Sequence, residues 1–197
     1  MAVPIDERER QALCDLLVDL GPDAPTLCEG WTTLDLAAHL VLREHFHRWG
    51  ETRLTAEKAK GYSVLVDRLR AGPPAVPWRI PGVRTVANGI EFFIHHEDVR
   101  RANGLGPRDP GRDLDNLSWR MLGVLARRPA RKMRPWSLTL DADDGRRRSF
   151  GSGAGATLRG PAPELLLYLS GRRDHALVEA DGSAEALDAL ASAMTGL

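Results

Sequence analysis

The sequence is poor in cysteine and in long apolar runs, and each shortage excludes a class of protein. Two cysteines, Cys14 and Cys28, cannot build the disulfide framework of a small secreted domain. No apolar run approaches the roughly 18 to 20 residues that a membrane-spanning helix needs, and the N-terminal residues lack the apolar stretch of a secretion signal. The sequence therefore predicts a cytoplasmic protein without a membrane partner.

The whole chain also has no net charge, because 27 basic residues balance 27 acidic ones. This balance gives no general field for nucleic acid, and the arginines at 146–148 lack the interleaved aromatic residues of a nucleic-acid surface. Residues 100–148 nevertheless contain thirteen basic and six acidic residues. This local surplus either attracts an anionic small molecule or is a solvated, arginine-rich surface.

The first two-thirds of the chain have the spacing of apolar residues that is typical of amphipathic helices. Thr32 with Asp35 forms a capping box at the start of one of them, and glycine or proline follows several of the expected ends. Five helices are predicted, over residues 4–20, 32–49, 55–71, 83–102 and 114–128.

The pattern changes near Arg134. Residues 136–140 and 146–150 predict a hairpin around the turn sequence DADDG, and the glycine-rich residues 151–156 predict a flexible turn. A short helix from Ala162, a strand over 175–180 and a closing helix capped by Ser183 complete the chain. We expect an α+β protein with a helical domain at 1–133 and a small mixed α/β domain at 134–197.

Two of the predicted helices carry residues that could hold a metal ion. Glu91 and His95 are four apart and share one helix face, while His39 lies among the small and apolar residues of an earlier helix. If these helices pack together, two imidazoles and a carboxylate form a three-point ligand set with open coordination positions. The alternative is an ordinary Glu–His surface pair beside a hydrogen-bonded core histidine.

The segments CEGWTTLDLAAHL (28–40) and EFFIHHEDVRRA (91–102) resemble the two signature segments of the mycothiol-dependent maleylpyruvate isomerase and DinB-like metal-binding superfamily. Within it, the chain is most similar to a small actinobacterial metal-binding group. The segment GPAPELLLYLSGRR (160–173) resembles part of the second domain of that isomerase. The resemblance implies a DinB-like up-and-down four-helix bundle, with one extra helix, and His39, Glu91 and His95 as metal ligands.

The resemblance also implies a function. A divalent ion, zinc first and nickel or iron as alternatives, would hold a low-molecular-weight thiol such as mycothiol as thiolate, ready to attack a small electrophile. The chain would then be a thiol transferase or an isomerase, as a monomer or homodimer. The alternative function is a non-catalytic module that binds metal or a small ligand in sensing or stress response.

Several further residues are assigned by position. Asp98 is expected to orient His95, with a solvent-exposed aspartate as the alternative, and Arg172 is the nearest candidate to hold a substrate or cofactor carboxylate. His96 is expected in the core. Cys28 has no base that the sequence identifies beside it. Surface or packing roles are expected for His45, His47 and His175.

Overall fold

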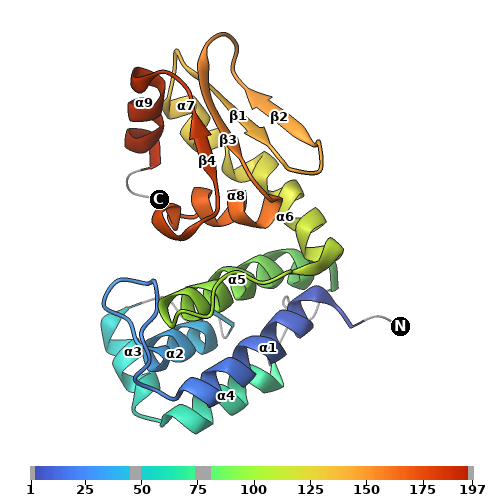
Figure 1. The fold of residues 1–197 in the computed structure, drawn as a ribbon. Helices are drawn as coiled ribbons and strands as arrows, with labels where there is room; N and C mark the ends of the chain where they lie inside the picture. Colours follow the sequence, from blue (N-terminus) through green and yellow to red (C-terminus); the bar gives the residue numbers. More distant parts are fainter. Residues whose placement is uncertain (1–2, 45–49, 74–80, 195–197) are drawn as a thin grey trace. The chain divides into compact units, whose positions relative to one another are not determined.

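The computed structural model describes residues 3–44, 50–73 and 81–194 of the 197-residue chain. The chain divides into two compact units, Met1–Asp109 and Pro110–Leu197 (Figure 1). This division lies before the boundary that we expected between residues 133 and 134. The helices that follow Pro110 belong to the second unit because they pack against its other helices: α6 (Gly111–Leu125) packs against α8 (Ala162–Leu169), and α7 (Arg127–Lys132) against α9 (Ala184–Met194).

The first unit is helical in its described part. Its elements are α1 (Ile5–Leu20), α2 (Thr33–Glu44), α3 (Glu51–Lys58), α4 (Tyr62–Ala71) and α5 (Pro81–Ala102). One half of the expected capping box at the start of α2 is present, since the Asp35 carboxylate accepts hydrogen bonds from both the backbone N–H and the hydroxyl of Thr32, each at 3.0 Å.

The single helix expected over 55–71 is two helices. Residues 59–61 separate α3 from α4, and Gly61 adopts a φ of 93° that a helix interior does not allow. Glycine reaches a positive φ at little cost, so Gly61 allows the chain to turn here. The prediction of one continuous helix was therefore wrong. The helices 4–20 and 83–102 are present within about two residues of their expected bounds.

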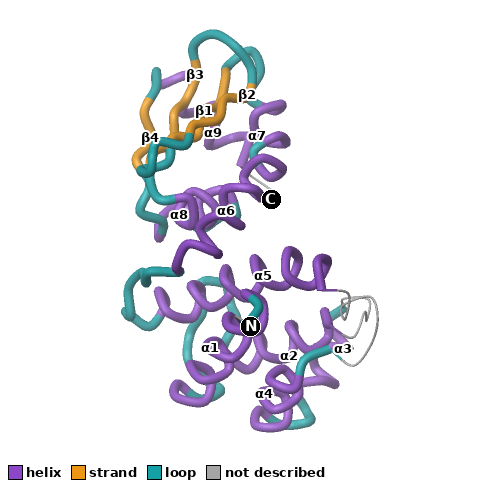
Figure 2. The backbone as a smooth tube through the Cα atoms, turned by 90° about the vertical axis from the view of Figure 1, so that its right-hand side faces the viewer, coloured by secondary structure: helices purple, strands orange, loops and turns teal. Residues whose placement is uncertain are grey.

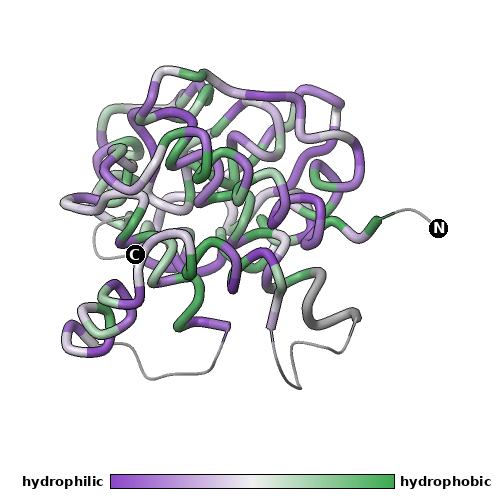
Figure 3. Tube along the Cα trace, turned by 90° about the horizontal axis from the view of Figure 1, so that it is seen from below, coloured by the Kyte–Doolittle hydropathy of each residue, from purple (hydrophilic) through white to green (hydrophobic). Residues whose placement is uncertain are grey.

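The core of the first unit is formed by α1, α2, α4 and α5. Leucines of α1, α2 and α4 pack with Phe92 and Val99 of α5, and all of these side chains are buried. Figure 3 shows hydrophobic and hydrophilic residues alternating along the helices, as expected where each helix buries one stripe. Burial of the apolar faces of α2 and α5 against this core fixes how the two helices lie.

The second unit contains the sheet, as Figure 2 shows. Four strands, β1 (Ser137–Asp141), β2 (Arg147–Phe150), β3 (Gly155–Arg159) and β4 (Glu179–Asp181), are ordered β2-β1-β3-β4. Strand β1 pairs antiparallel with β2 and parallel with β3. Its helices are α6 (Gly111–Leu125), α7 (Arg127–Lys132), α8 (Ala162–Leu169) and α9 (Ala184–Met194), with a 3₁₀ turn at Arg173–His175. The expected α+β class is confirmed at this level.

The sequence interpretation missed β3. Residues 155 and 156 belong to this strand rather than to a flexible turn, and Gly155 pairs with Ser137. A Cβ atom at Gly155 would lie 2.6 Å from the carbonyl carbon of Ser137, so glycine is needed for close strand approach and not for flexibility. The strand expected over 175–180 is also shorter, because Arg173–His175 forms the 3₁₀ turn and pairing begins at Glu179.

Within the described residues, no helix is both long enough and apolar enough to cross a membrane.

Candidate metal centre

Helices α2 and α5 bring His39, Glu91 and His95 together. One ligand atom from each side chain lies within 4.8 Å of the other two. The Oε1 atom of Glu91 is 3.6 Å from Nε2 of His39 and 3.4 Å from Nε2 of His95. The three residues that the sequence analysis grouped thus converge on one point of the first unit.

These distances fit a shared cation better than they fit direct hydrogen bonds. An N–H···O hydrogen bond has its donor and acceptor about 2.7 to 3.2 Å apart. Ligand atoms that each lie about 2.0 to 2.2 Å from a tetrahedral zinc ion are instead about 3.3 to 3.6 Å from one another. The two distances from the Glu91 carboxylate oxygen to the imidazole nitrogens are therefore compatible with a common ion.

The imidazole of His39 is held in place from two sides. The ring of Trp31 lies 5.1 Å from it, and the ring of His95 lies 5.5 Å away in an edge-on arrangement. Trp31 reaches this position on a loop before α2, where its backbone N–H donates to the Cys28 carbonyl at 2.9 Å. The side chains of His39 and Glu91 keep 17% and 28% of their surface exposed, so a small molecule can reach the site.

The other nitrogen of His95 is fixed by Asp98. Nδ1 of His95 lies 3.0 Å from Oδ2 of Asp98, whose side chain is completely buried. An ionised carboxylate can only accept, so Nδ1 carries the proton and Nε2 is directed toward Glu91. Asp98 thus has the position expected of a group that orients His95, one turn along the same helix.

Two polar residues that the sequence analysis did not select form a hydrogen-bonded chain that starts at Glu91. Nε of Arg43 lies 3.2 Å from Oε1 of Glu91, and Nη1 of Arg43 donates to Oδ1 of Asn88 at 2.7 Å. Asn88 in turn donates to Glu44 at 3.2 Å. Arg43 could have been found from its position four residues after His39 on the same helix, whereas Asn88 carries no such signal.

Cys28 also lies beside two residues of the site, which the sequence did not indicate. Its Sγ atom lies 3.3 Å from Oδ2 of Asp98 and 3.9 Å from Nδ1 of His95, so a carboxylate and an imidazole lie beside it although the sequence identified neither. The loop before α2 returns to α5, where Leu27 N–H donates to the Asp98 carbonyl at 3.2 Å. Cys28, His95 and Asp98 form a second group of possible ligands that shares His95 with the first.

The charges around the site favour a cation. Burial acts to raise the pKa of Glu91, but the contacts with His39 and His95 and the charge of Arg43 outweigh it and hold that pKa below its usual range. Burial acts to lower the pKa of His95, yet Asp98, Cys28 and Glu91 raise it well above the usual range. The Glu91 and Asp98 carboxylates therefore stabilise positive charge at His95, which a proton or a metal ion can supply.

The remaining selected residues lie elsewhere. His96 is buried on another face of α5, with Nδ1 3.6 Å from the Glu9 carboxylate. His175 is exposed in the 3₁₀ turn of the second unit. Arg172 also belongs to the second unit, where its Nη1 donates to the Ser170 carbonyl at 2.5 Å. His45 and His47 lie outside the described residues.

Comparison with known proteins gives a family for the second unit. Residues 113–189 match the family model described as the MDMPI C-terminal domain, where the abbreviation stands for mycothiol maleylpyruvate isomerase. No curated protein gives a significant match to the chain, and no solved structure does. The match begins in α6, so it also places that helix with the second unit.

Proposed function

Since residues 113–189 belong to the family of maleylpyruvate isomerase C-terminal domains, we propose that the chain is a metal-dependent protein that uses a low-molecular-weight thiol, mycothiol in the first instance, in a transfer or isomerisation reaction. His39, Glu91 and His95 would hold the ion. The observation that carries the proposal is their convergence, within 4.8 Å, in the domain that precedes the matched one.

The residues present fit a divalent ion. Two imidazole nitrogens and one carboxylate oxygen are a usual set of three protein ligands for zinc in sites that keep a position open. The same set accepts nickel or iron. The positive charge of Arg43 beside Glu91 opposes a second cation, but the buried Asp98 carboxylate behind His95 compensates for it. Glu91 and Asp98 together thus exceed the charge of Arg43 and leave one net negative charge around the position proposed for the ion.

Each side chain then has a definite task. Asp98 holds the proton on Nδ1 of His95 and leaves Nε2 as the ligand atom. Trp31 fixes the plane of the His39 imidazole, and Arg43 restricts the rotation of Glu91. When bound, the ion would supply a Lewis-acid position at which a thiol loses its proton at neutral pH. The partly exposed faces of His39 and Glu91 leave room on that side for a small electrophile.

Further parts of this proposal extend the family relationship. The first unit would be a DinB-like up-and-down bundle, and Arg172 would hold a carboxylate of the substrate. The protein would act in the cytoplasm as a monomer or homodimer. Helical content alone supports the first of these in the described part of the first unit.

Metal analysis tests the site. Protein purified without an affinity tag should contain about one divalent ion per chain, and His39→Ala and Glu91→Ala should each lose most of it. His175→Ala is the matched control, because it removes an exposed histidine from the other unit. Native chains that hold no metal, or a His39→Ala variant that keeps it, would contradict the proposed ligand set.

A conjugation assay tests the chemistry separately. The holoprotein is mixed with mycothiol and a general electrophile, and loss of free thiol is followed over time. Conjugation by native protein that is absent from Glu91→Ala supports an enzyme. Stoichiometric metal without any thiol chemistry supports instead a non-catalytic metal-binding module, because the same ligand set then serves sensing or storage.

A further inference from the structure

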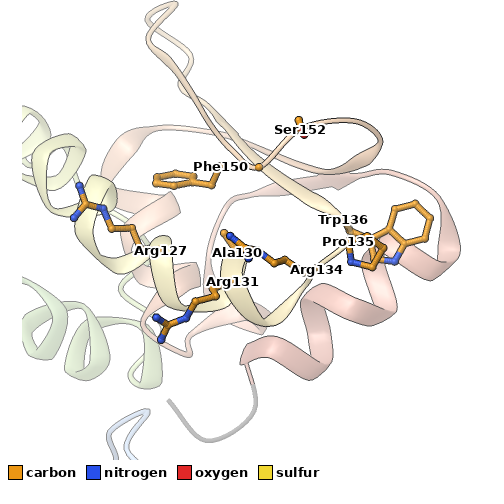
Figure 4. A pocket seen from close by; sticks show the side chains of 9 residues that line it. Arg127, Ala130, Arg131, Arg134, Pro135, Trp136, Phe150 and Ser152 are labelled. Carbon is orange, nitrogen blue, oxygen red and sulfur yellow. The ribbon is translucent and has the colours of Figure 1, made fainter.

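The second unit contains a hollow of about 690 Å³ that the metal site does not use. Figure 4 shows the side chains that line it, which come from α7, from the residues before β1 and from the end of β2. Three of them are arginines, Arg127, Arg131 and Arg134, and two are the aromatic residues Trp136 and Phe150. The volume lies within the range of about 300 to 1,000 Å³ that is usual for small-ligand sites.

The charge of these three arginines is not balanced within the hollow. Among the described residues no carboxylate pairs with any of them, and the lining contains no acidic side chain. Arg127 and Arg131 lie four apart on α7, and Arg134 follows three residues later. Arg127 and Arg131, four apart on one helix, repel one another. The fold therefore maintains a concentration of positive charge that its described carboxylates do not neutralise.

A neighbouring hollow adds a further arginine, which the surrounding residues hold in place. A second hollow of about 390 Å³ shares Arg127 and Phe150 with the first and adds Arg148. Arg148 is fixed, since its Nη1 donates to the Trp119 carbonyl at 3.2 Å and its guanidinium lies 4.9 Å from the Trp119 ring centre. Gly123 leaves room for it, because a Cβ atom there would lie 3.0 Å from Cζ of Arg148.

We propose that this hollow binds a small organic anion that carries at least two negative charges and a planar ring. Guanidinium groups donate paired hydrogen bonds to carboxylates and to phosphates alike. The faces of Phe150 and Trp136 offer apolar surface on which a ring can stack. Part of the surplus of basic residues over 100–148 thus has a local purpose in the second unit, independent of the metal centre in the first.

Titration calorimetry on the full-length chain at low ionic strength tests this proposal with separable probes. ADP and phthalate each combine a ring with two or more charges, supplied as phosphate in one and as carboxylate in the other. Pyrophosphate has the charge without the ring, and adenosine has the ring without the charge. We expect ADP or phthalate to bind with a Kd below about 1 mM, and about tenfold more tightly than pyrophosphate and adenosine. The tighter of the two identifies the anionic group.

Variants decide whether the hollow is the site. Arg131→Gln and Arg134→Gln should each weaken binding by about fivefold or more. Arg128→Gln removes the same charge from an exposed residue of α7 outside the lining, and should change the Kd by less than about twofold. The thermal unfolding temperature of Arg131→Gln should be equal to that of the native protein or slightly higher, because the substitution removes a repulsion between like charges.

Three results would overturn the proposal. The first is that neither ADP nor phthalate binds. The second is that Arg128→Gln weakens binding as much as Arg131→Gln does. The third is that pyrophosphate binds as tightly as the ring-bearing probes.

Discussion

The Nδ1 atom of His95 lies 3.0 Å from the Oδ2 atom of Asp98, and Asp98 is completely buried. The two residues are three apart on α5, so their contact is built into the helix and needs no other element to form. The contact sets the tautomer of His95 and hence the direction of its ligand atom.

Replacement of Asp98 by asparagine should therefore weaken metal binding without unfolding the protein. The amide oxygen of the new side chain can still accept from Nδ1 of His95, but the negative charge behind the imidazole is lost. Groups in this position typically contribute 10- to 100-fold in affinity, and we expect a loss of about tenfold. Competition with a chromogenic chelator measures it. Asp67→Asn, at an exposed position of α4, is the control. Equal affinity in the Asp98 and Asp67 variants would show that Asp98 has no such role.

A second prediction concerns the buried ion pair that joins α1 to α2. Nη1 of Arg10 donates to Oε2 of Glu44 at 2.6 Å, and both side chains are at most 4% exposed. Glu44→Leu leaves the guanidinium buried without its partner and should lower the free energy of unfolding by about 3 to 5 kcal/mol. Chemical denaturation followed by circular dichroism gives this value.

The double variant Arg10→Met/Glu44→Leu separates charge from packing. It removes both charges and keeps similar volume, so it should recover much of the stability lost in Glu44→Leu. Arg10 also lies 4.5 Å from the ring centre of Phe92, and methionine retains an apolar contact there. A double variant less stable than Glu44→Leu would indicate that packing of Arg10, rather than charge, dominates.

The pH dependence of stability should include a contribution from Glu9. Burial acts to raise the pKa of Glu9, but contacts with His96 and Arg108 hold it below the ordinary value of 4.5. A carboxyl whose pKa is lower in the folded state stabilises the fold above its unfolded pKa. This contribution is lost as pH falls from 4.5 through the lower folded pKa.

Glu9→Gln should accordingly be less stable than the native protein by about 2 kcal/mol at neutral pH. The difference should shrink as the pH falls below 4.5, because native Glu9 then becomes protonated too. Urea unfolding of both proteins from neutral pH down to about pH 3 measures this. A difference that stays constant with pH would assign the loss to packing rather than to charge.

The parts of the fold that the sequence predicted are those with local signals. The pair Glu91 and His95, and its contact with Asp98, follow from helical spacing, and the cap at Thr32 follows from Asp35. The contacts of Cys28 were not predictable in this way. They depend on a loop that returns to α5, and the sequence separation of 70 residues between Cys28 and Asp98 carries no periodic signal.

The same distinction explains the second unit. The hairpin of β1 and β2 has a turn sequence between its strands, and it is present. Strand β3 pairs in parallel with β1 although β2 lies between them in the sequence, so no local turn sequence indicates this pairing. A segment whose glycines permit close approach of two strands also has the same amino-acid composition as a flexible loop. Composition therefore could not distinguish the two at residues 151–156.

Substitution of Gly155 tests this interpretation of the glycine-rich segment. In Gly155→Ala the added Cβ atom would lie 2.6 Å from the carbonyl carbon of Ser137, so the backbone of β1 or β3 must shift. We expect a loss of about 2 to 3 kcal/mol in the free energy of unfolding. Gly153→Ala is the matched control, since a Cβ atom there meets open space and only its φ of 83° is unfavourable. Its cost should be about 1 kcal/mol. If Gly155→Ala is no more harmful than Gly153→Ala, the segment behaves as a flexible turn, and close pairing of β1 with β3 does not require glycine at position 155.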